Sequence, residues 1–265
     1  MGIASLRWGV LWLLLGGCAT SATLLPQGED ERASLALRAR LHGTSLRGTT
    51  LHIGGSDLRA DELLSPFYLS RGDRLAWCTP VGPRAQADQL LQALAQARAD
   101  GLDPEAYYYS KIVAALAAWR TPAGLRPDIV ALVELDLLLS NAFLRYGAHL
   151  QRGRVDPRRI HAHWAAPYIK GGLGSLLQTA LDLNRVQEAL NGLWPPQPGY
   201  AHLRASLMRY RALAASGGWQ RVDERGDGLA PRLEASGDLD STRSLRAALA
   251  LFQLRRGLPA SGRLD

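Results

Sequence analysis

Apolar residues recur at helical spacing along most of the chain, and this pattern predicts a mainly helical protein. Around residue 90 one face is apolar while Gln and Arg side chains occupy the other; the apolar positions are Ala87, Leu90, Leu91, Leu94 and Ala97. Similar spacing predicts helical structure in residues 32–41, 60–120, 128–150, 173–190, 200–215 and 242–256. A short extended piece is expected at 51–53, before a pair of glycines. We therefore expect an all-α fold.

The apolar stripes of two of the predicted helices indicate which faces are buried. For 128–150 the stripe consists of Ile129, Leu132, Val133, Leu139, Phe143 and Tyr146. For 200–215 it consists of Tyr200, Leu203, Leu207 and Tyr210. Pro-rich breaks at 122–127 and 194–198 and a turn at 153–157 separate the helices. Residues 223–237 are polar and contain glycine, which indicates a linker before the last helix.

Composition excludes some classes of protein without selecting a function. The 265 residues are 47% hydrophobic and 21% charged, which is typical of a globular chain and not of a disordered or polytopic membrane protein. The 31 basic and 24 acidic residues give a net charge of +7. A positive charge of this size favours anionic surfaces such as nucleic acid, phospholipid or acidic wall polymers.

The N-terminus indicates export. Arg7 precedes the apolar run 8–15, which is too short to span a bilayer, and small residues follow it. The word Leu15-Gly16-Gly17-Cys18 resembles a lipobox, so residues 1–18 are expected to be a signal peptide, with Cys18 lipidated. Ordinary cleavage after Ala22 is the alternative. We expect a periplasmic protein, anchored in the outer membrane of a Gram-negative bacterium and with no nucleic-acid partner.

No residue pattern identifies a catalytic, cofactor-binding or metal site. Once Cys18 is acylated or removed, Cys78 has no disulfide partner, and a small buried residue is its expected role. His161 and His163, with Asp156 upstream, lack a further Cys or Glu ligand nearby and are expected to be solvated or hydrogen-bonded. The chain contains no phosphate-binding glycine loop, zinc-protease word or nucleophile elbow.

Carboxylates and aromatic residues between 88 and 109 are better explained by structure than by chemistry. Asp100, Asp103 and Glu105 lie where helix caps are needed, with Gly101 and Pro104 between them. The alternative is that these three carboxylates, together with Asp88, serve a glycosidase. Among the successive tyrosines, Tyr107 has core spacing, whereas Tyr108 or Tyr109 is expected to be exposed, and the sequence does not decide whether it stacks on a sugar.

Several short words resemble the N-terminal scaffold domain of large periplasmic L,D-transpeptidases of the YcbB type. The resemblance covers residues 62–219. Its words are Phe67-Tyr68 with Arg71, Leu75 and Trp77; Asp100-Gly101-Leu102-Asp103-Pro104 with Tyr107; Gly153-Arg154-Val155-Asp156-Pro157; and Pro198-Gly199-Tyr200 with Leu203, Leu207, Tyr210-Arg211 and Gly217-Gly218-Trp219. Each word is short, and their order and spacing carry the match.

The C-terminal residues resemble part of the peptidoglycan-binding module that follows in this family. Its words are Ser236-Gly237-Asp238-Leu239, then Ala247, Phe252-Gln253, Arg255-Arg256-Gly257-Leu258 and Gly262. The resemblance implies that Phe252 anchors a three-helix core, that Gly257 caps its helix and that Leu258 returns to the core. The first helix looks shortened and the third is missing, so we expect the tail to be mobile, or docked on the main domain, with Leu245, Leu249, Phe252 and Leu258 lacking partners.

Together these observations divide the chain into a signal peptide at 1–18, a linker at 19–50, a scaffold-like helical domain at 51–222 and a truncated peptidoglycan-binding-like module at 223–265. The Ser-His-Gly-Cys word of the family's catalytic domain does not occur. We expect an exported envelope protein, related to the cross-linking machinery and non-catalytic as it stands, that binds peptidoglycan weakly and needs no cofactor. The alternatives are the N-terminal fragment of a complete L,D-transpeptidase and an unrelated helical envelope adaptor.

Overall fold

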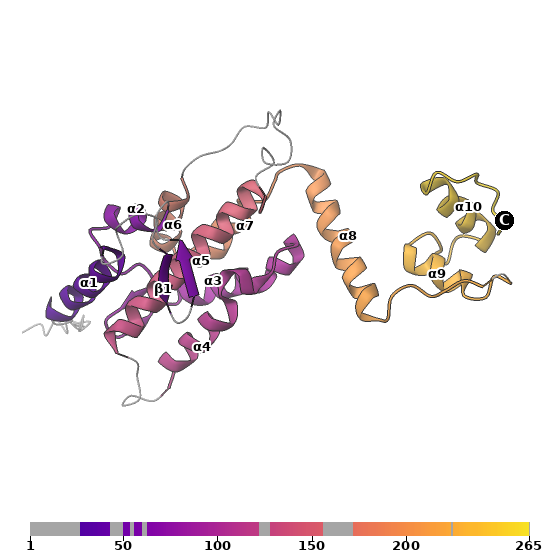
Figure 1. Ribbon diagram of the computed structural model, residues 1–265. Coiled ribbons are helices and arrows are strands. Elements are labelled where there is room, and N and C mark those ends of the chain that lie inside the picture. The colour runs from indigo at the N-terminus through magenta and orange to yellow at the C-terminus, as the bar shows by residue number, and fades with distance from the viewer. Residues whose placement is uncertain are drawn as a thin grey trace, which may run out of the picture.

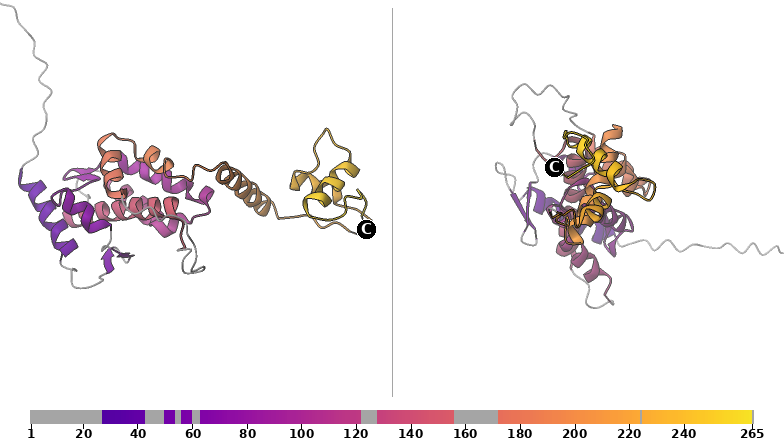
Figure 2. Two further views of the ribbon diagram at one scale, coloured as in Figure 1. Left: turned by 90° about the horizontal axis from the view of Figure 1, so that it is seen from above. Right: turned by 90° about the vertical axis from the view of Figure 1, so that its right-hand side faces the viewer.

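A computed structural model describes residues 27–42, 50–53, 56–59, 63–121, 128–155, 172–223 and 225–264. In these ranges the chain is mostly helical, which confirms the all-α prediction. Figures 1 and 2 show an elongated arrangement, in which α8 (Pro198–Ala215) runs from a helical body toward a small C-terminal pair of helices. The body and the pair have separate apolar cores.

Helix α5 (Ile129–Arg152) is the central element of the body. Its N-cap is Asp128, whose side chain accepts a hydrogen bond from the Ala131 amide at 2.9 Å. Helices contact it from several sides: α1 (Gln27–His42), α2 (Leu64–Ser70), α3 (Gln86–Ala95), α4 (Tyr109–Trp119), α6 (Leu173–Asp182) and α7 (Val186–Asn191). Between Leu132 and Leu150 almost every residue is therefore buried, and the predicted stripe was too narrow.

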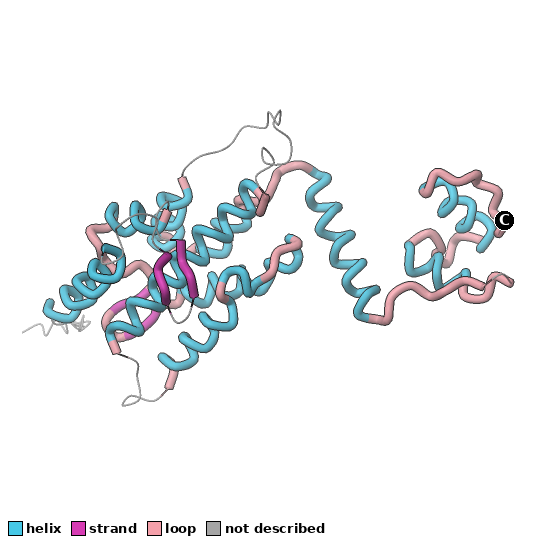
Figure 3. Tube along the Cα trace, in the orientation of Figure 1, coloured by secondary structure: helices cyan, strands magenta, loops and turns pink. Residues whose placement is uncertain are grey.

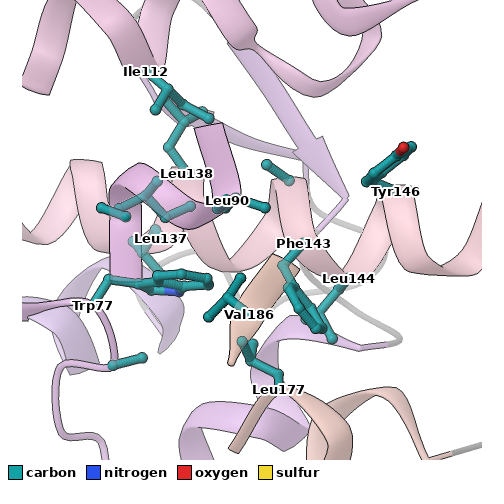
Figure 4. Packing of buried hydrophobic residues seen from close by; sticks show 14 of the residues in the cluster. Trp77, Leu90, Ile112, Leu137, Leu138, Phe143, Leu144, Tyr146, Leu177 and Val186 are labelled. Carbon is teal, nitrogen blue, oxygen red and sulfur yellow. The ribbon is translucent and has the colours of Figure 1, made fainter. Parts of the chain in front are cut away.

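Large side chains from distant parts of the chain fill the space around α5. In Figure 4, Trp77, Leu90, Ile112 and Val186 lie around Leu137 and Phe143 of this helix. The Trp77 and Phe143 rings have centroids 6.2 Å apart. Burying a side chain of this size contributes roughly 1.5–3 kcal/mol, so this cluster is the main source of stability of the body.

Residues 60–120 are not continuously helical, contrary to the sequence expectation. Between α2 and α3 the chain forms a short antiparallel pair, β3 (Cys78–Thr79) with β4 (Gly82–Pro83), in which Cys78 faces Pro83 and Thr79 faces Gly82. After α3 come two turns of 3-10 helix, η1 (Gln96–Asp100) and η2 (Pro104–Tyr107), and then α4. Proline lacks an amide hydrogen, so Pro80 and Pro83 disfavour a helix here.

Two of the predicted caps in this region, Gly101 and Asp103, are confirmed. Gly101 is left-handed, with φ of 74°, directly after η1. The Asp103 side chain accepts a hydrogen bond from the Glu105 amide at 3.1 Å at the start of η2. Short-range backbone requirements of this kind can be predicted from sequence because both partners lie within a few residues.

The body begins earlier than expected. Helix α1 lies inside the predicted linker, yet Ala33, Leu37 and Leu41 of this helix are buried in the main core. Its Arg38 forms an ion pair with Asp73 at 2.8 Å. The four-residue spacing of these apolar positions explains the docked face. Beyond α1, the extended piece is confirmed: β1 (Thr50–Ile53) pairs with β2 (Ser56–Arg59), and Ile53 faces Ser56.

Two helices replace the single one predicted over 173–190. Helix α6 ends at Asp182 and α7 begins at Val186, because Asn184 between them adopts a left-handed conformation with φ of 54°. Helix α8 forms as predicted, but its expected apolar face is not buried. No residue of α8 is buried, and Leu203 is 70% exposed.

The C-terminal unit consists of α9 (Leu229–Ser236) and α10 (Leu245–Arg255) in the part of the chain that the structure describes. Helix α9 lies within the predicted linker, so that assignment was wrong. Leu233, Ala248 and Leu249 form a small core, and Phe252 packs against it. The predicted lack of partners therefore holds only for Leu245 and Leu258, which are 43% and 53% exposed. Gly257 and Gly262 turn the chain with positive φ.

The helices of the described ranges are too short or too polar to cross a lipid bilayer. Figure 3 shows how little of the described chain is in strands.

Candidate functional site

A buried carboxylate organises the centre of the body. Asp136 of α5 is fully buried and accepts hydrogen bonds from the amides of Ala76, Trp77 and Cys78 at 2.8–2.9 Å. The Tyr68 hydroxyl donates to the same carboxylate at 2.5 Å. Three successive amides that point at one side chain cannot take part in a helix, which is the second reason why the chain is not helical here. Asp136 therefore fixes the entry to the β3–β4 pair.

Burial shifts the ionisation of the groups around this carboxylate. It raises the pKa of Asp136 above 3.8, and the four hydrogen bonds to the carboxylate lower the pKa by less. It also raises the pKa of the Cys78 thiol well above its ordinary value, and Asp136 adds to this shift. A neutral thiol is a poor nucleophile. The predicted structural role of Cys78 agrees with its exposed fraction of 1%.

A polar groove of about 740 Å³ lies above this segment, between α1, the end of α2, the β3–β4 pair and α6. Its charged residues come from different elements: Asp30 and Glu31 from α1, Arg71, Arg74 and Arg84 from the chain around the β3–β4 pair, and Asp182 from α6. Cys78, Thr79 and Pro80 line it too. The volume lies in the range of roughly 300–1,000 Å³ found for small-ligand sites.

Arg71 is held in place within the groove. Its guanidinium donates to Gln178 of α6 and to the Leu75 carbonyl, the latter at 2.9 Å. Its partial burial lowers the pKa of the guanidinium below its ordinary value. Arg74 donates through Nε alone, to the Arg71 carbonyl at 2.9 Å. Arg71 thus connects α2 to α6, and Arg74 lines the groove beside it.

A second polar cluster joins α8 to the body. Asp100, at the end of η1, accepts hydrogen bonds from Tyr146 at 3.0 Å and Tyr200 at 2.9 Å, and forms an ion pair with Arg204 of α8 at 2.7 Å. The Arg204 guanidinium also lies over the Trp194 ring, 3.9 Å from its centroid. Asp100 was predicted to be a helix cap, and this prediction is wrong. Its carboxylate is instead the main polar attachment of α8 to the body.

Aromatic residues extend this cluster along α5. Tyr107 is buried, as its spacing predicted, and its hydroxyl lies 2.8 Å from Nδ1 of His149. Burial and nearby arginines lower the pKa of His149 to about 4. Tyr108 and Tyr109 pack partly against the core, so neither presents a fully free ring. The Tyr107–His149 contact therefore joins η2 to α5 through a hydrogen bond between neutral groups.

The C-terminal unit meets the end of α8 at a small pocket of about 170 Å³. Tyr210 of α8 lines it together with Ser236, Asp238, Phe252, Arg255 and Arg256. Arg255 and Asp238 form an ion pair at 2.6 Å. Beside it, the Arg232 guanidinium lies 3.6 Å from the centroid of Trp219. Tyr210 and Trp219 are 44% and 37% exposed. Partly exposed rings and arginines thus share one surface.

Residues 62–207 match a protein-family model described as Scaffold domain. This match covers more than half of the chain. The chain belongs to the Scaffold domain family. That domain occurs in L,D-transpeptidases, which agrees with the family predicted from the sequence words at this coarser level. No curated protein and no solved structure matches the chain.

The scaffold domain brings together some of the residues singled out in the sequence and leaves others apart. Asp88 pairs with Arg120, and Glu105 accepts a hydrogen bond from the Ser110 hydroxyl at 2.6 Å, so neither faces a shared cleft as a glycosidase would require. Cys18, Asp156, His161 and His163 lie outside the described residues. Among the residues that are described, no group of His, Cys, Asp or Glu could hold a metal ion.

Sequence reasoning missed Asp136 and the groove above it. The one available signal was a lone acidic residue within the apolar run Leu135 to Leu139. A carboxylate within an apolar run is buried only when it has hydrogen-bond partners, so the existence of such partners could have been predicted from the run. Their identity could not be read from the sequence, because Tyr68 lies 68 residues away.

Proposed function

We propose that this chain is a non-catalytic scaffold of the bacterial cell envelope that supports peptidoglycan cross-linking of the L,D-transpeptidase kind. The single observation that carries the proposal is the family match over residues 62–207. In this role the body is a rigid support, and α8 holds the C-terminal unit away from it. The finer likeness to the YcbB type is part of this proposal.

The lack of acyl-transfer activity in this chain is also part of the proposal. Acyl transfer of the L,D-transpeptidase kind needs a thiolate with a base beside it. Of the two cysteines in the chain, Cys78 is 1% exposed and Cys18 belongs to the proposed signal. The purified chain should form no cross-linked product from disaccharide tetrapeptides in a chromatographic assay in which a catalytic L,D-transpeptidase does. Product formation by this chain would overturn the proposal.

Peptidoglycan is the proposed partner of the C-terminal unit. The partly exposed rings of Tyr210 and Trp219 can stack on sugars, and the neighbouring guanidinium groups of Arg232, Arg255 and Arg256 can bind carboxylates. The pocket is small, and its core consists of few residues. We therefore propose weak binding to the wall by this unit. Its relation to the peptidoglycan-binding module of the family is likewise a proposal.

The second candidate is that these residues are the N-terminal part of a complete L,D-transpeptidase, which the occurrence of the domain in such enzymes favours. The scaffold and wall-binding roles would be the same in that case. The genomic sequence downstream of the Asp265 codon distinguishes the two. An in-frame catalytic segment with a Ser-His-Gly-Cys word would favour the complete enzyme, and a stop codon would favour the separate scaffold.

Export and lipid anchoring at Cys18 complete the proposed function. The word Leu15-Gly16-Gly17-Cys18 predicts that the mature protein begins at an acylated cysteine and partitions with the outer membrane. Globomycin treatment, or Cys18→Ser, should leave an unprocessed precursor, detected as a slower band and by its intact mass. Cys78→Ala, which changes the other cysteine, is the control and should be processed normally. Normal processing of Cys18→Ser would contradict the assignment.

A further inference from the structure

The groove between α1, the β3–β4 pair and α6 contains opposite charges that do not neutralise one another. Asp30 and Glu31 line it on α1, Asp182 lines it on α6, and Arg74 and Arg84 line it near the β3–β4 pair. In the part of the chain that the structure describes, none of these carboxylates forms an ion pair with either arginine, and Asp182 accepts a hydrogen bond from Gln178 at 2.8 Å. Both kinds of charge are therefore available to a bound molecule.

Separated charges of opposite sign define the ligand that fits best. A simple anion would be attracted by the arginines and repelled by the carboxylates. A simple cation would be attracted by the carboxylates and repelled by the arginines. A molecule with an amine at one end and a carboxylate at the other satisfies both sets at once. From this arrangement we infer that the groove binds a short peptide with free ends, its carboxylate at Arg74 and Arg84 and its amine at Asp30 and Glu31.

The remaining lining suits the body of such a peptide. Ala33, Leu75 and Pro80 provide apolar contacts, and Gln178 is fixed beside them by Arg71. A volume of 740 Å³ is large enough for more than a single amino acid. The inference adds a peptide ligand for the scaffold body to the proposed function, and it does not depend on wall binding by the C-terminal unit.

One competing explanation concerns Asp30 alone. This residue lies in the first turn of α1, where negative charge is favourable without any ligand. Glu29 shares that position but does not line the groove, and Arg32 is an exposed arginine of the same helix outside the groove. Glu29→Gln and Arg32→Gln are therefore matched controls, because each removes one charge from α1 without changing the groove.

The experiment uses the full chain and alanine peptides of two to five residues with free ends, titrated by calorimetry at low salt. The best-fitting length should bind, and N-acetylation or C-amidation should each weaken binding about tenfold, since each removes a charge-assisted contact. The double variant Arg74→Gln/Arg84→Gln should bind the free peptide about tenfold more weakly and become insensitive to C-amidation, while remaining sensitive to N-acetylation.

Asp30→Asn/Glu31→Gln should show the opposite selectivity: insensitivity to N-acetylation with retained sensitivity to C-amidation. The two control variants should bind like the unchanged chain, and unchanged circular dichroism would verify that all variants are folded. Absence of binding at every peptide length, equal binding of capped and free peptides, or variants that respond alike to both caps would each overturn the inference. None of these results bears on whether the chain performs acyl transfer or binds the wall, so this inference and the proposed function fail separately.

Discussion

Replacing Asp136 with alanine should destabilise the body by about 4 kcal/mol or more, the largest single-residue effect that we expect. The carboxylate accepts three backbone amides and the Tyr68 hydroxyl in a fully buried site. Removing it leaves the three amides without an acceptor, at roughly 1–3 kcal/mol each, although relaxation and water entry recover part of the loss. The Tyr68 hydroxyl keeps the Asp136 carbonyl and the Ser140 hydroxyl within hydrogen-bond distance, at 3.0 Å and 2.7 Å. Urea unfolding followed by circular dichroism measures the change.

Asp88→Ala is the matched control for this prediction. Asp88 is about half exposed and pairs with Arg120 on the surface, where an ion pair is worth about 0–1 kcal/mol. Its removal should therefore shift the urea midpoint very little. If Asp136→Ala unfolded within 1 kcal/mol of the unchanged chain, the four hydrogen bonds would not be the organising contacts of the body.

The pH dependence of stability offers an independent reading of the same site. Because burial raises the pKa of Asp136 in the folded state above 3.8, the folded state holds this proton more tightly than the unfolded state. That contribution is fully present below the unfolded value and is lost as pH rises through the folded pKa. The stability difference between the unchanged chain and Asp136→Asn should therefore shrink as pH rises from about 3.8, the ordinary pKa of the group.

Leu233→Ala should unfold the C-terminal unit and leave the body intact. Leu233 is 1% exposed and belongs to a core with only Ala248 and Leu249 as other buried members. A buried Leu→Ala change costs about 2–5 kcal/mol, which so small a core cannot sustain. Limited trypsin digestion should then cut at the arginines of α9 and α10, while the body stays protected, and retention on isolated sacculi should be lost.

Leu254→Ala is the control for the C-terminal unit, since Leu254 lies on α10 and is 66% exposed. It should change neither the digestion pattern nor retention on sacculi. Two results would count against our account of this unit. One is resistance of Leu233→Ala to trypsin. The other is full retention of a variant whose C-terminal unit has been shown to be digested.

What could be predicted from the sequence was mainly local. Gly101 and Asp103 were correctly placed at helix ends, because a cap and its partner lie within three residues. The helical period also located α3, α5, α8 and α10. The pattern assigned the residues of α9 to a linker, because Pro231 and two flanking glycines resemble one, although proline is tolerated in the first turn of a helix. Only the family resemblance led us to expect a shortened helix there.

The contacts that build the candidate sites could not be predicted, because they join distant residues. Asp100 looked like a cap from its neighbours, yet its partners Tyr146 and Tyr200 are 46 and 100 residues away. The charges of the groove come from α1, the β3–β4 region and α6, and only the packing of these elements around α5 brings them together. Periodicity identifies a buried face and not the element that covers it.

The central claim is that this chain supports cross-linking without performing it, and intact-mass spectrometry after incubation with a carbapenem tests it most directly. A carbapenem acylates a reactive active-site thiolate, whereas the Cys78 thiol is buried and its pKa is raised. The account predicts an unchanged mass under conditions in which a catalytic L,D-transpeptidase is fully acylated. A stoichiometric adduct that is lost in Cys78→Ala would contradict it.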